Sequence, residues 1–176
     1  IEPIQTRDHT ERMLKNFGAN LEIASVASKN VIKLAPSNHL NAKNYTVVGD
    51  ISSAAFLIVA ALIGNSQGLE ITNVGVNPSR TGVLLALQKM GADIEVKNQR
   101  LESGEPCADL KINKSTLRGV ELSGDIIPNI IDEIPIISIA AAFAEGETVI
   151  RDAKELRVKE TDRLKAVSDG FIRLGV

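Results

Sequence analysis

The sequence predicts an α/β (α+β) fold built from a repeated β-α-β-α-β-β unit, and internal repetition is the main reason. Three stretches begin with a polar residue and an arginine, continue through an apolar helical pattern, and reach Gly-Ala or Gly-Val: residues 6–23, 79–96 and 162–176. A second pattern, Gly-Asp-Ile followed by an apolar helix, recurs at residues 49–62 and 124–143. Two independent matches at nearly one period, longer than that of common solenoids, indicate a repeated supersecondary unit.

Between Gly49 and Gly124 the hydrophobic pattern defines the elements of one unit in order. It predicts strands at residues 45–50, 69–74, 92–96, 108–112 and 119–122, and helices at 52–63 and 78–90. Serine and aspartate stand at the start of the first helix as available caps. The second helix has Asn77 as its N-cap, Pro78 at its first position and Gly91 as its stop.

Residues 1–45 read as the end of a preceding unit. A helix is expected at 8–17, where "DHTE" fits a capping box with Asp8 at the N-cap and Glu11 at the third helical position. Two strands, "NLEIAS" and "VIKLA", follow this helix.

Residues 125–176 supply two helices and one strand. The first helix is expected to start at Asp132 and Glu133, and the second at Thr161 or Asp162. The chain therefore begins inside one unit and ends inside another, and we expect it to be part of a longer protein.

Three arginines recur where a helix starts: Arg7, Arg80 and Arg163. A cation is unfavourable at this end of a helix, by a few tenths of a kcal/mol up to about 1 kcal/mol. An anion site would explain the repetition, because N-terminal N–H groups and guanidinium groups both favour phosphate or carboxylate. Local pairing of each arginine with a nearby acid would explain it equally well.

The acids near these arginines also have two interpretations. Asp132 and Glu133 precede a proline and suit helix capping, and Glu160 suits an i,i+3 surface pair with Arg163. Alternatively, they are proton-transfer groups with cations beside them. The residue patterns alone indicate only a possible anion site between helix ends.

Composition excludes several classes of function. A net charge of −2 gives no basic field for nucleic acid or a membrane surface. The longest apolar runs, 54–63 and 134–144, are shorter than the roughly 18 residues of a membrane span. The single cysteine, Cys107, excludes an intrachain disulfide and favours a reducing compartment, so we expect a cytoplasmic protein. His9 and His39 have no second ligand at metal spacing.

Five motifs resemble the 5-enolpyruvylshikimate-3-phosphate synthase (3-phosphoshikimate 1-carboxyvinyltransferase) family: "TRDHTERML", "GDISSAAFLIVAAL", "NPSRTG", "IIDEIPIISIAAAFAEGET" and "ELRVKETDRLK". The resemblance covers the whole chain in order, and "RVKETDR" together with "IDEIP" is its most specific part. "RDHTE" and "NPSR" resemble class II, the glyphosate-tolerant type, although Ser79 stands where threonine is usual.

The resemblance implies the enolpyruvyl transferase fold, an inside-out α/β barrel of two domains. Each domain contains three β-α-β-α-β-β units whose helix N-termini point to the cleft between the domains. Residues 1–45 then correspond to the tail of the first globular domain, namely a final helix and two strands. Residues 46–176 correspond to the first two units of the second domain, the last one incomplete.

The implied reaction transfers the enolpyruvyl group of phosphoenolpyruvate to the 5-hydroxyl of shikimate 3-phosphate and releases phosphate. It proceeds by addition and elimination, without metal or organic cofactor. By resemblance, Asp132 is the acid that contacts the shikimate hydroxyls and a candidate base, and Glu160 handles the methylene proton. These two are the expected catalytic residues.

The expected binding residues also follow from the resemblance. Lys159 and Arg7 match contacts to shikimate 3-phosphate, Arg163 matches a phosphoenolpyruvate contact, and Asp50 lies at the crossover and lines the cleft. Arg80 has no counterpart of known role, so local pairing is the interpretation kept for it. The implied partners are the two substrates, with no nucleic acid and no membrane, and the full-length protein is expected to be a monomer.

Two other functions remain as alternatives. The sister enzyme that acts on UDP-N-acetylglucosamine shares the fold and chemistry but normally uses a loop cysteine, whereas Cys107 lies in a hairpin region. A non-catalytic phosphate-binding module is the second alternative. Because the family's Gly-rich phosphoenolpyruvate loop has no counterpart here, we expect the isolated chain to lack activity and to leave sheet edges open to association.

The main geometric prediction is that four residues far apart along the chain gather on one wall of a pocket: Asp132, Lys159, Glu160 and Arg163.

Overall fold

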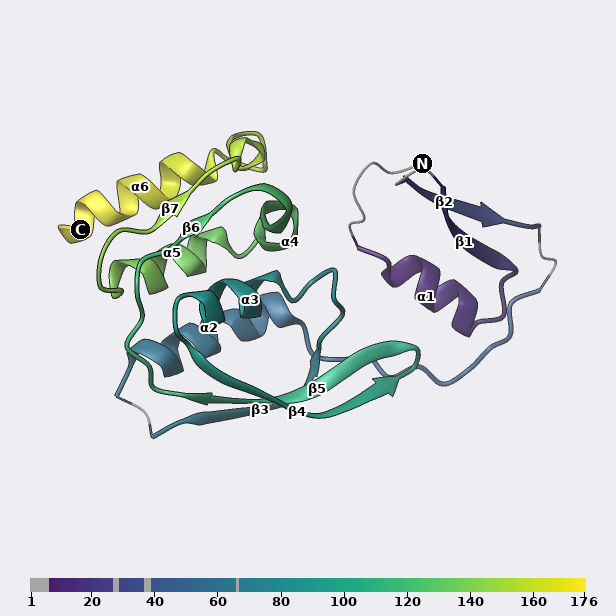
Figure 1. Ribbon diagram of the computed structural model, residues 1–176. Helices are drawn as coiled ribbons and strands as arrows, with labels where there is room; N and C mark the ends of the chain where they lie inside the picture. Colours follow the sequence, from purple (N-terminus) through teal and green to yellow (C-terminus); the bar gives the residue numbers. More distant parts are fainter. Residues whose placement is uncertain (1–6, 27–28, 37–38, 66) are drawn as a thin grey trace.

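The structure is a computed structural model that describes residues 7–26, 29–36, 39–65 and 67–176. Helices and strands alternate along most of the chain (Figure 1). In chain order the elements are α1 (His9–Asn16), β1 (Leu21–Val26), β2 (Lys29–Leu34), α2 (Ile51–Ile63), β3 (Leu69–Gly75), α3 (Gly82–Lys89), β4 (Asp93–Glu102), β5 (Glu105–Asn113), β6 (Glu121–Leu122), the 3₁₀ helix η1 (Gly124–Ile126), α4 (Ile127–Ile130), α5 (Ile134–Ala142), β7 (Val149–Ile150), the 3₁₀ helix η2 (Lys154–Arg157) and α6 (Arg163–Leu174).

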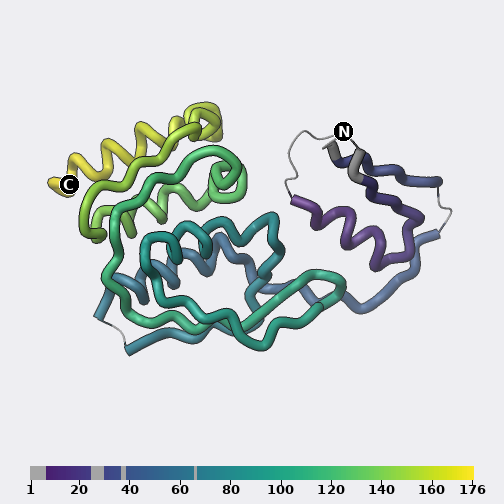
Figure 2. The backbone as a smooth tube through the Cα atoms, viewed as in Figure 1, coloured from purple at the N-terminus to yellow at the C-terminus, as the bar shows by residue number. Residues whose placement is uncertain are grey.

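The N-terminal elements form a small unit beside the rest of the molecule. Helix α1 lies against the antiparallel β1–β2 hairpin, and a long connection leads from this hairpin to α2 (Figures 1 and 2). The predicted helix and two strands are confirmed here. The predicted capping box is wrong: Asp8 occupies the N-cap position, but its side chain makes no capping hydrogen bond. Its carboxylate accepts hydrogen bonds from Arg12 and Asn77 instead.

The first complete copy of the repeat is a three-stranded antiparallel sheet in the order β3-β5-β4, with α2 and α3 on one face. Strand β5 alternates between the buried Leu110 and Ile112 and the partly exposed Asp109 and Lys111. One face of the sheet therefore packs under the helices, and the other carries polar side chains, as expected for an antiparallel sheet with one solvated face.

The strand predicted at residues 45–50 is wrong, because only Gly49 pairs, in an isolated parallel bridge with Val74. The segment that precedes Gly49 lies near the end of α1, where the ring of Tyr45 stacks on Phe17 with centroids 5.9 Å apart. After Gly49 the carboxylate of Asp50 caps α2 and turns the chain into that helix. Pairing is therefore limited to a single position.

Helix α3 begins at Gly82, four residues later than predicted. Asn77 caps a separate turn, because its Oδ1 accepts from the backbone N–H of Ser79 at 2.9 Å. The predicted stop is confirmed at Gly91, whose φ of 94° is the left-handed conformation that glycine adopts most readily. At the start of α3, a Cβ on Gly82 would lie 2.7 Å from the backbone oxygen of Asn129, so α3 and α4 approach closely.

The second copy of the repeat pairs β6 in parallel with β7. The helix start predicted at Asp132 and Glu133 is confirmed, because Glu133 is the N-cap of α5, and the short η1 and α4 precede it. The helix start predicted at Thr161 or Asp162 is also confirmed, because α6 begins after Asp162, which caps it, and η2 ends earlier at Arg157. Helix α5 packs against α2 and α6, so the helices of the two copies share one core. The largest fully buried side chains of this shared core are Ile58, Leu62, Leu87, Met90, Leu110, Ile112, Leu117, Leu122, Ile130, Ile137, Leu156 and Val59.

Two β-bulges flank the central strand β5, one in β3 and one in β4. They hold Asn73 and Asn98 at φ angles of 56° and 50°. Asp109 of β5 joins both bulges, because its Oδ1 accepts from Asn73 N and its Oδ2 from Asn98 Nδ2, each at 2.9 Å. Beyond the bulges, the β4–β5 hairpin extends beneath α1 (Figure 1).

Candidate functional site

Charged side chains from three distant segments meet at Asp132, which lies between α4 and α5. The guanidinium of Arg7, just before α1, donates to Asp132 Oδ2. Arg163 Nη1, from the first residue of α6, donates to Asp132 Oδ1 at 3.2 Å. One carboxylate thus accepts from two guanidinium groups that lie 125 and 31 residues away in sequence.

Arg163 also binds Glu160 through two parallel hydrogen bonds. Its Nε lies 2.8 Å from Glu160 Oε1, and its Nη2 lies 2.9 Å from Oε2. This bidentate geometry fixes the plane of the guanidinium group. The cap of α6 sets the position of Arg163, because Asp162 Oδ1 accepts from Lys165 N at 3.0 Å. A single arginine therefore links the two carboxylates.

Lys159 lies at the edge of this group. Its Nζ is 2.6 Å from Glu155 Oε1, so its direct partner is an i,i+4 acid rather than Asp132. Its positive charge nevertheless acts on both Asp132 and Glu160. We define the anion-facing cluster as Arg7, Asp132, Lys159, Glu160 and Arg163.

The cations of this cluster keep its acids ionised. Burial raises the pKa of Asp132, but the hydrogen bond and charge of Arg7, with the charges of Lys159 and Arg163, outweigh burial and lower it. The hydrogen bond from Arg163 is the main cause of the lowered pKa of Glu160. Both groups are therefore carboxylates at neutral pH.

A second group of polar residues lies beside the first, at the starts of α2 and α5. Asp50 caps α2 by accepting from Ser52 N at 3.2 Å and Ser53 N at 3.0 Å. Arg80 Nη2 lies 3.4 Å from Asp50 Oδ1 and donates to Ser52 Oγ. Ser52 Oγ in turn donates to Glu133, whose side chain is only 4% exposed.

The environment of Glu133 differs from that of Asp132. Burial raises the pKa of Glu133, while the Ser52 hydrogen bond and the Arg80 charge oppose the rise. Arg80 Nη2 lies 3.9 Å from Glu133 Oε1. Local pairing, the interpretation kept for Arg80, matches these contacts, but the sequence did not indicate the bridge through Ser52.

A third group joins α1 to the end of the β4–β5 hairpin. His9 Nδ1 lies 2.8 Å from Glu105 Oε1. The buried amide of Asn77 donates to Glu105 Oε2 at 3.2 Å and to Asp8 Oδ1 at 2.6 Å. No pattern in the sequence predicted this group, because His9 and Glu105 are 96 residues apart.

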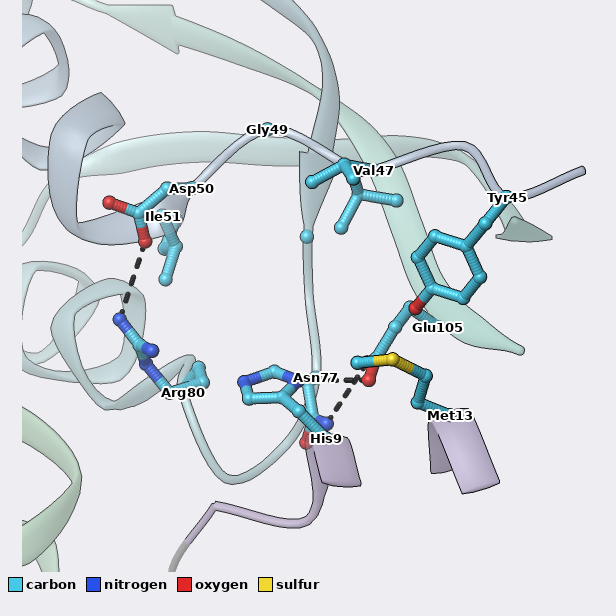
Figure 3. A pocket seen from close by; sticks show the side chains of 12 residues that line it. His9, Met13, Tyr45, Val47, Gly49, Asp50, Ile51, Asn77, Arg80 and Glu105 are labelled. Carbon is cyan, nitrogen blue, oxygen red and sulfur yellow. Dashed lines mark hydrogen bonds and ion pairs between the residues drawn. The ribbon is translucent and has the colours of Figure 1, made fainter. Parts of the chain in front are cut away.

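A cavity of about 270 Å³ lies between α1 and the start of α2 (Figure 3). Arg80 and Asp50 stand at one end, and His9, Asn77 and Glu105 stand at the other. The remaining lining is mostly apolar: Met13, Tyr45, Val47, Val48, Gly49, Ile51 and Gly75.

The structure brings together most of the residues predicted from sequence. Asp132, Glu160, Arg163 and Arg7 are in direct contact, and Lys159 is close enough to act on the acids. Asp50 lies apart from them, in the group of Arg80 and Ser52.

The cluster contains the groups that proton transfer and anion binding require. Carboxylates can exchange protons with a bound hydroxyl or carbon acid, and guanidinium groups can bind phosphate or carboxylate in bidentate fashion. Among the described residues, no three His, Cys, Asp or Glu side chains are grouped as metal ligands. Within the same part of the chain, every helix is too short or too polar to cross a bilayer.

Comparison with known proteins gives consistent matches. A family model described as EPSP synthase (3-phosphoshikimate 1-carboxyvinyltransferase) matches residues 3–176. A 3-phosphoshikimate 1-carboxyvinyltransferase from Petrotoga mobilis is 52% identical over 176 residues, which are 100% of this chain and 40% of that protein. One from Synechococcus sp. is 53% identical over 174 residues, which are 99% of this chain and 39% of that protein.

A solved structure gives the same result. EPSP synthase from Acinetobacter baumannii matches with a TM-score of 0.87 at 47% identity, over 97% of this chain and 38% of that chain. The present chain thus spans about 40% of the length of the relatives it matches.

Proposed function

This chain belongs to the EPSP synthase family, and on that premise we propose that the whole protein transfers an enolpyruvyl group from phosphoenolpyruvate to shikimate 3-phosphate. The family resemblance inferred from the motifs and the predicted α/β fold are both confirmed by the matches. Because these residues are about 40% of the relatives' length, the activity is proposed for the whole protein that contains them.

The observation that carries the proposal is the double contact of Arg163 with Asp132 and Glu160. The reaction needs a base near the 5-hydroxyl, an acid near the methylene carbon of phosphoenolpyruvate, and cations for its anionic groups. The anion-facing cluster supplies two carboxylates and three cations within one network.

In the addition step, we assign Asp132 as the base. The 5-hydroxyl oxygen attacks C2 of phosphoenolpyruvate, the hydroxyl proton passes to Asp132, and the methylene carbon takes a proton. The lowered pKa of Asp132 makes it a weak base while Arg7 and Arg163 hold it. A substrate phosphate or carboxylate that draws these guanidinium groups away would raise this pKa and strengthen the base.

We assign Glu160 to the methylene proton in both steps. It gives a proton to C3 during addition and removes one from the new methyl group during elimination, when the C–O bond to phosphate breaks and inorganic phosphate leaves. Glu160 must be protonated for its first task, whereas Arg163 favours its ionised form. Transfer of Arg163 to the phosphoenolpyruvate anion would remove that bias.

The binding roles follow the same division. We propose that Arg7 and Lys159 contact shikimate 3-phosphate, that Arg163 contacts phosphoenolpyruvate, and that Asp50 lines the cleft. Two observations support these roles: Arg7 is half exposed, and Lys159 acts on Asp132 through its charge.

The setting of the chain within the whole protein is also proposed. Residues 1–45 belong to the end of one domain, and residues 46–176 form the first two units of the next. The separate β1–β2 unit with α1 and the shared core of α2, α3 and α5 support this division. We further propose a monomer in the cytoplasm, for which the buried free thiol of Cys107 is suited.

The test is the acceptor specificity of the whole protein. Phosphoenolpyruvate should release inorganic phosphate when shikimate 3-phosphate is added, and the enolpyruvyl product should be detectable by NMR. Phosphate release with UDP-N-acetylglucosamine and none with shikimate 3-phosphate would replace the proposed acceptor. Binding of shikimate 3-phosphate without turnover would support a non-catalytic phosphate-binding protein instead.

A further inference from the structure

The consecutive acids Asp132 and Glu133 face different surroundings, and Glu133 has no part in the proposed reaction. Asp132 is in contact with Arg7 and Arg163 in the anion-facing cluster. Glu133 is 3% exposed and lies among Ser52 and Arg80. A buried carboxylate is costly unless it is paired and hydrogen-bonded, so its presence beside the candidate base calls for a physical reason.

The contacts of Glu133 fix it to two other elements. Ser52 Oγ, at the start of α2, donates to Glu133 and accepts from Arg80, which comes from the turn before α3. Arg80 also reaches Asp50, the cap of α2. The starts of α2 and α5 and the turn before α3 are thus joined by one guanidinium group and one hydroxyl group.

This bridge restrains the backbone from which Asp132 projects. Glu133 is the N-cap residue of α5, and its backbone N–H donates to Ile130 O at 2.9 Å. The Glu133 side chain is held by a buried bridge, while the Asp132 carboxylate is held by partly exposed guanidinium groups for which anionic substrates can compete. When those guanidinium groups turn to a substrate, the bridge through Ser52 still holds the Glu133 side chain, in addition to the backbone hydrogen bonds at the start of α5.

We propose that Ser52, Arg80 and Glu133 are positioning residues for Asp132. This inference rests on the proposed function, because Asp132 is the base of that reaction. None of the three residues needs to touch a substrate. Their effect is on the direction in which the Asp132 carboxylate points, and a misplacement of about 1 Å can lower a rate about 10²-fold.

The test compares Ser52→Ala with Ser52→Thr in the whole protein. Alanine removes the bridging hydroxyl and leaves both charges in place, whereas threonine keeps the hydroxyl. We expect Ser52→Ala to lower kcat about 10-fold or more while KM for both substrates stays nearly unchanged. Ser52→Thr should restore most of kcat. Ser138→Ala is the matched control, because Ser138 Oγ donates to the backbone oxygen of Ile134 within α5.

Glu133→Gln supplies a second variant, since glutamine keeps the shape of the side chain and removes its charge. It should show the same fall in kcat at nearly constant KM, with the folded state checked by circular dichroism. If Glu133→Gln does not fold, the Ser52 pair decides the result.

Two results would overturn the inference while the proposed function stands: a fully active Ser52→Ala protein, or a raised KM with unchanged kcat. A wild-type protein without turnover would overturn the proposed function and this inference together. The two failures are therefore distinguishable.

Discussion

Arg80 and Arg163 occupy matching places in the two copies of the repeat, yet their surroundings differ. The side chain of Arg80 is 16% exposed and lies among Asp50, Ser52 and Glu133. That of Arg163 is 25% exposed and lies between Asp132 and Glu160. Of the two adjacent acids, Asp132 contacts Arg163 and Glu133 contacts Arg80. The repeated arginine thus pairs with a buried acid in one copy and with two partly exposed acids in the other.

The largest effect should be a loss of turnover when Asp132, the acid that Arg163 shares with Arg7, is replaced. Asp132→Asn keeps the size of the side chain but removes the proposed base, so turnover should fall about 10²- to 10⁴-fold. The free energy of unfolding at neutral pH should fall by only about 1 kcal/mol, because the pairs of Asp132 with Arg7 and Arg163 are partly exposed. Steady-state phosphate release measures the rate, and Glu121→Gln, which removes the charge of an exposed pair with Arg151, is the control. A variant at the wild-type rate would remove Asp132 from the mechanism.

Replacing each arginine by methionine should separate the two roles. Arg80→Met leaves the buried Glu133 without its cation, and the free energy of unfolding should fall by about 1–3 kcal/mol. Arg163→Met should change stability by less than about 1 kcal/mol, since its pairs are partly solvated. It should instead weaken phosphoenolpyruvate binding by about 1.5–3 kcal/mol through the lost charge-assisted hydrogen bonds. Urea denaturation and calorimetric titration measure the two quantities, and the reverse pattern would contradict the comparison.

The two acids should give opposite dependences of stability on pH. The pKa of Asp132 is lowered in the folded state, so its contribution is present above the ordinary aspartate pKa and is lost as pH falls through the lowered value. The pKa of Glu133 is raised, so its contribution is present below the ordinary glutamate pKa and is lost as pH rises through the raised value.

In Asp132→Asn the free energy of unfolding should therefore fall less steeply as pH drops below the ordinary aspartate pKa. In Glu133→Gln it should fall less steeply as pH rises above the ordinary glutamate pKa. Urea denaturation between about pH 3 and pH 8 would measure both effects. Parallel curves for wild type and Glu133→Gln would show that Glu133 titrates alike in the folded and unfolded states.

The smallest effect is expected for an arginine outside both groups. Arg151 forms an exposed pair with Glu121, with Nε and Oε1 2.8 Å apart. Arg151→Met should change the free energy of unfolding by about 0.5 kcal/mol or less and leave turnover unchanged. A loss comparable to that of Arg80→Met would mean that burial does not distinguish the arginines of this chain.

Local signals in the sequence were sufficient for much of the fold. The apolar run of α2 and the glycine stop at Gly91 depend on neighbours within one turn, and both were predicted. Asn77 looked like the cap of a helix starting at Pro78, but it caps a separate turn and donates to Asp8 and Glu105. Local propensity has no information about such distant partners, which explains the late start of α3.

The candidate site shows the same limit. Glu160 and Arg163 are three residues apart, so their pairing follows from local sequence. The proximity of Asp132 to them was predicted through the family resemblance. The bridge from Ser52 to Glu133 spans 81 residues, and Ser52 looked like an ordinary helix-start serine. The one available signal was the recurrence of an arginine at position 80, which local pairing explained without identifying its partners.

The carboxylate of Asp109 affects the junction between α1 and the end of the β4–β5 hairpin, which lies farther along the same strands. By holding the bulges of β3 and β4 in step, it sets the direction of the hairpin whose tip carries Glu105 to His9. A substitution there would change the angle at which α1 docks, although the Asp109 carboxylate bonds to Asn73, Asn98 and Arg100 rather than to that helix. Asp109 therefore bears on the alignment of two units as well as on the sheet itself.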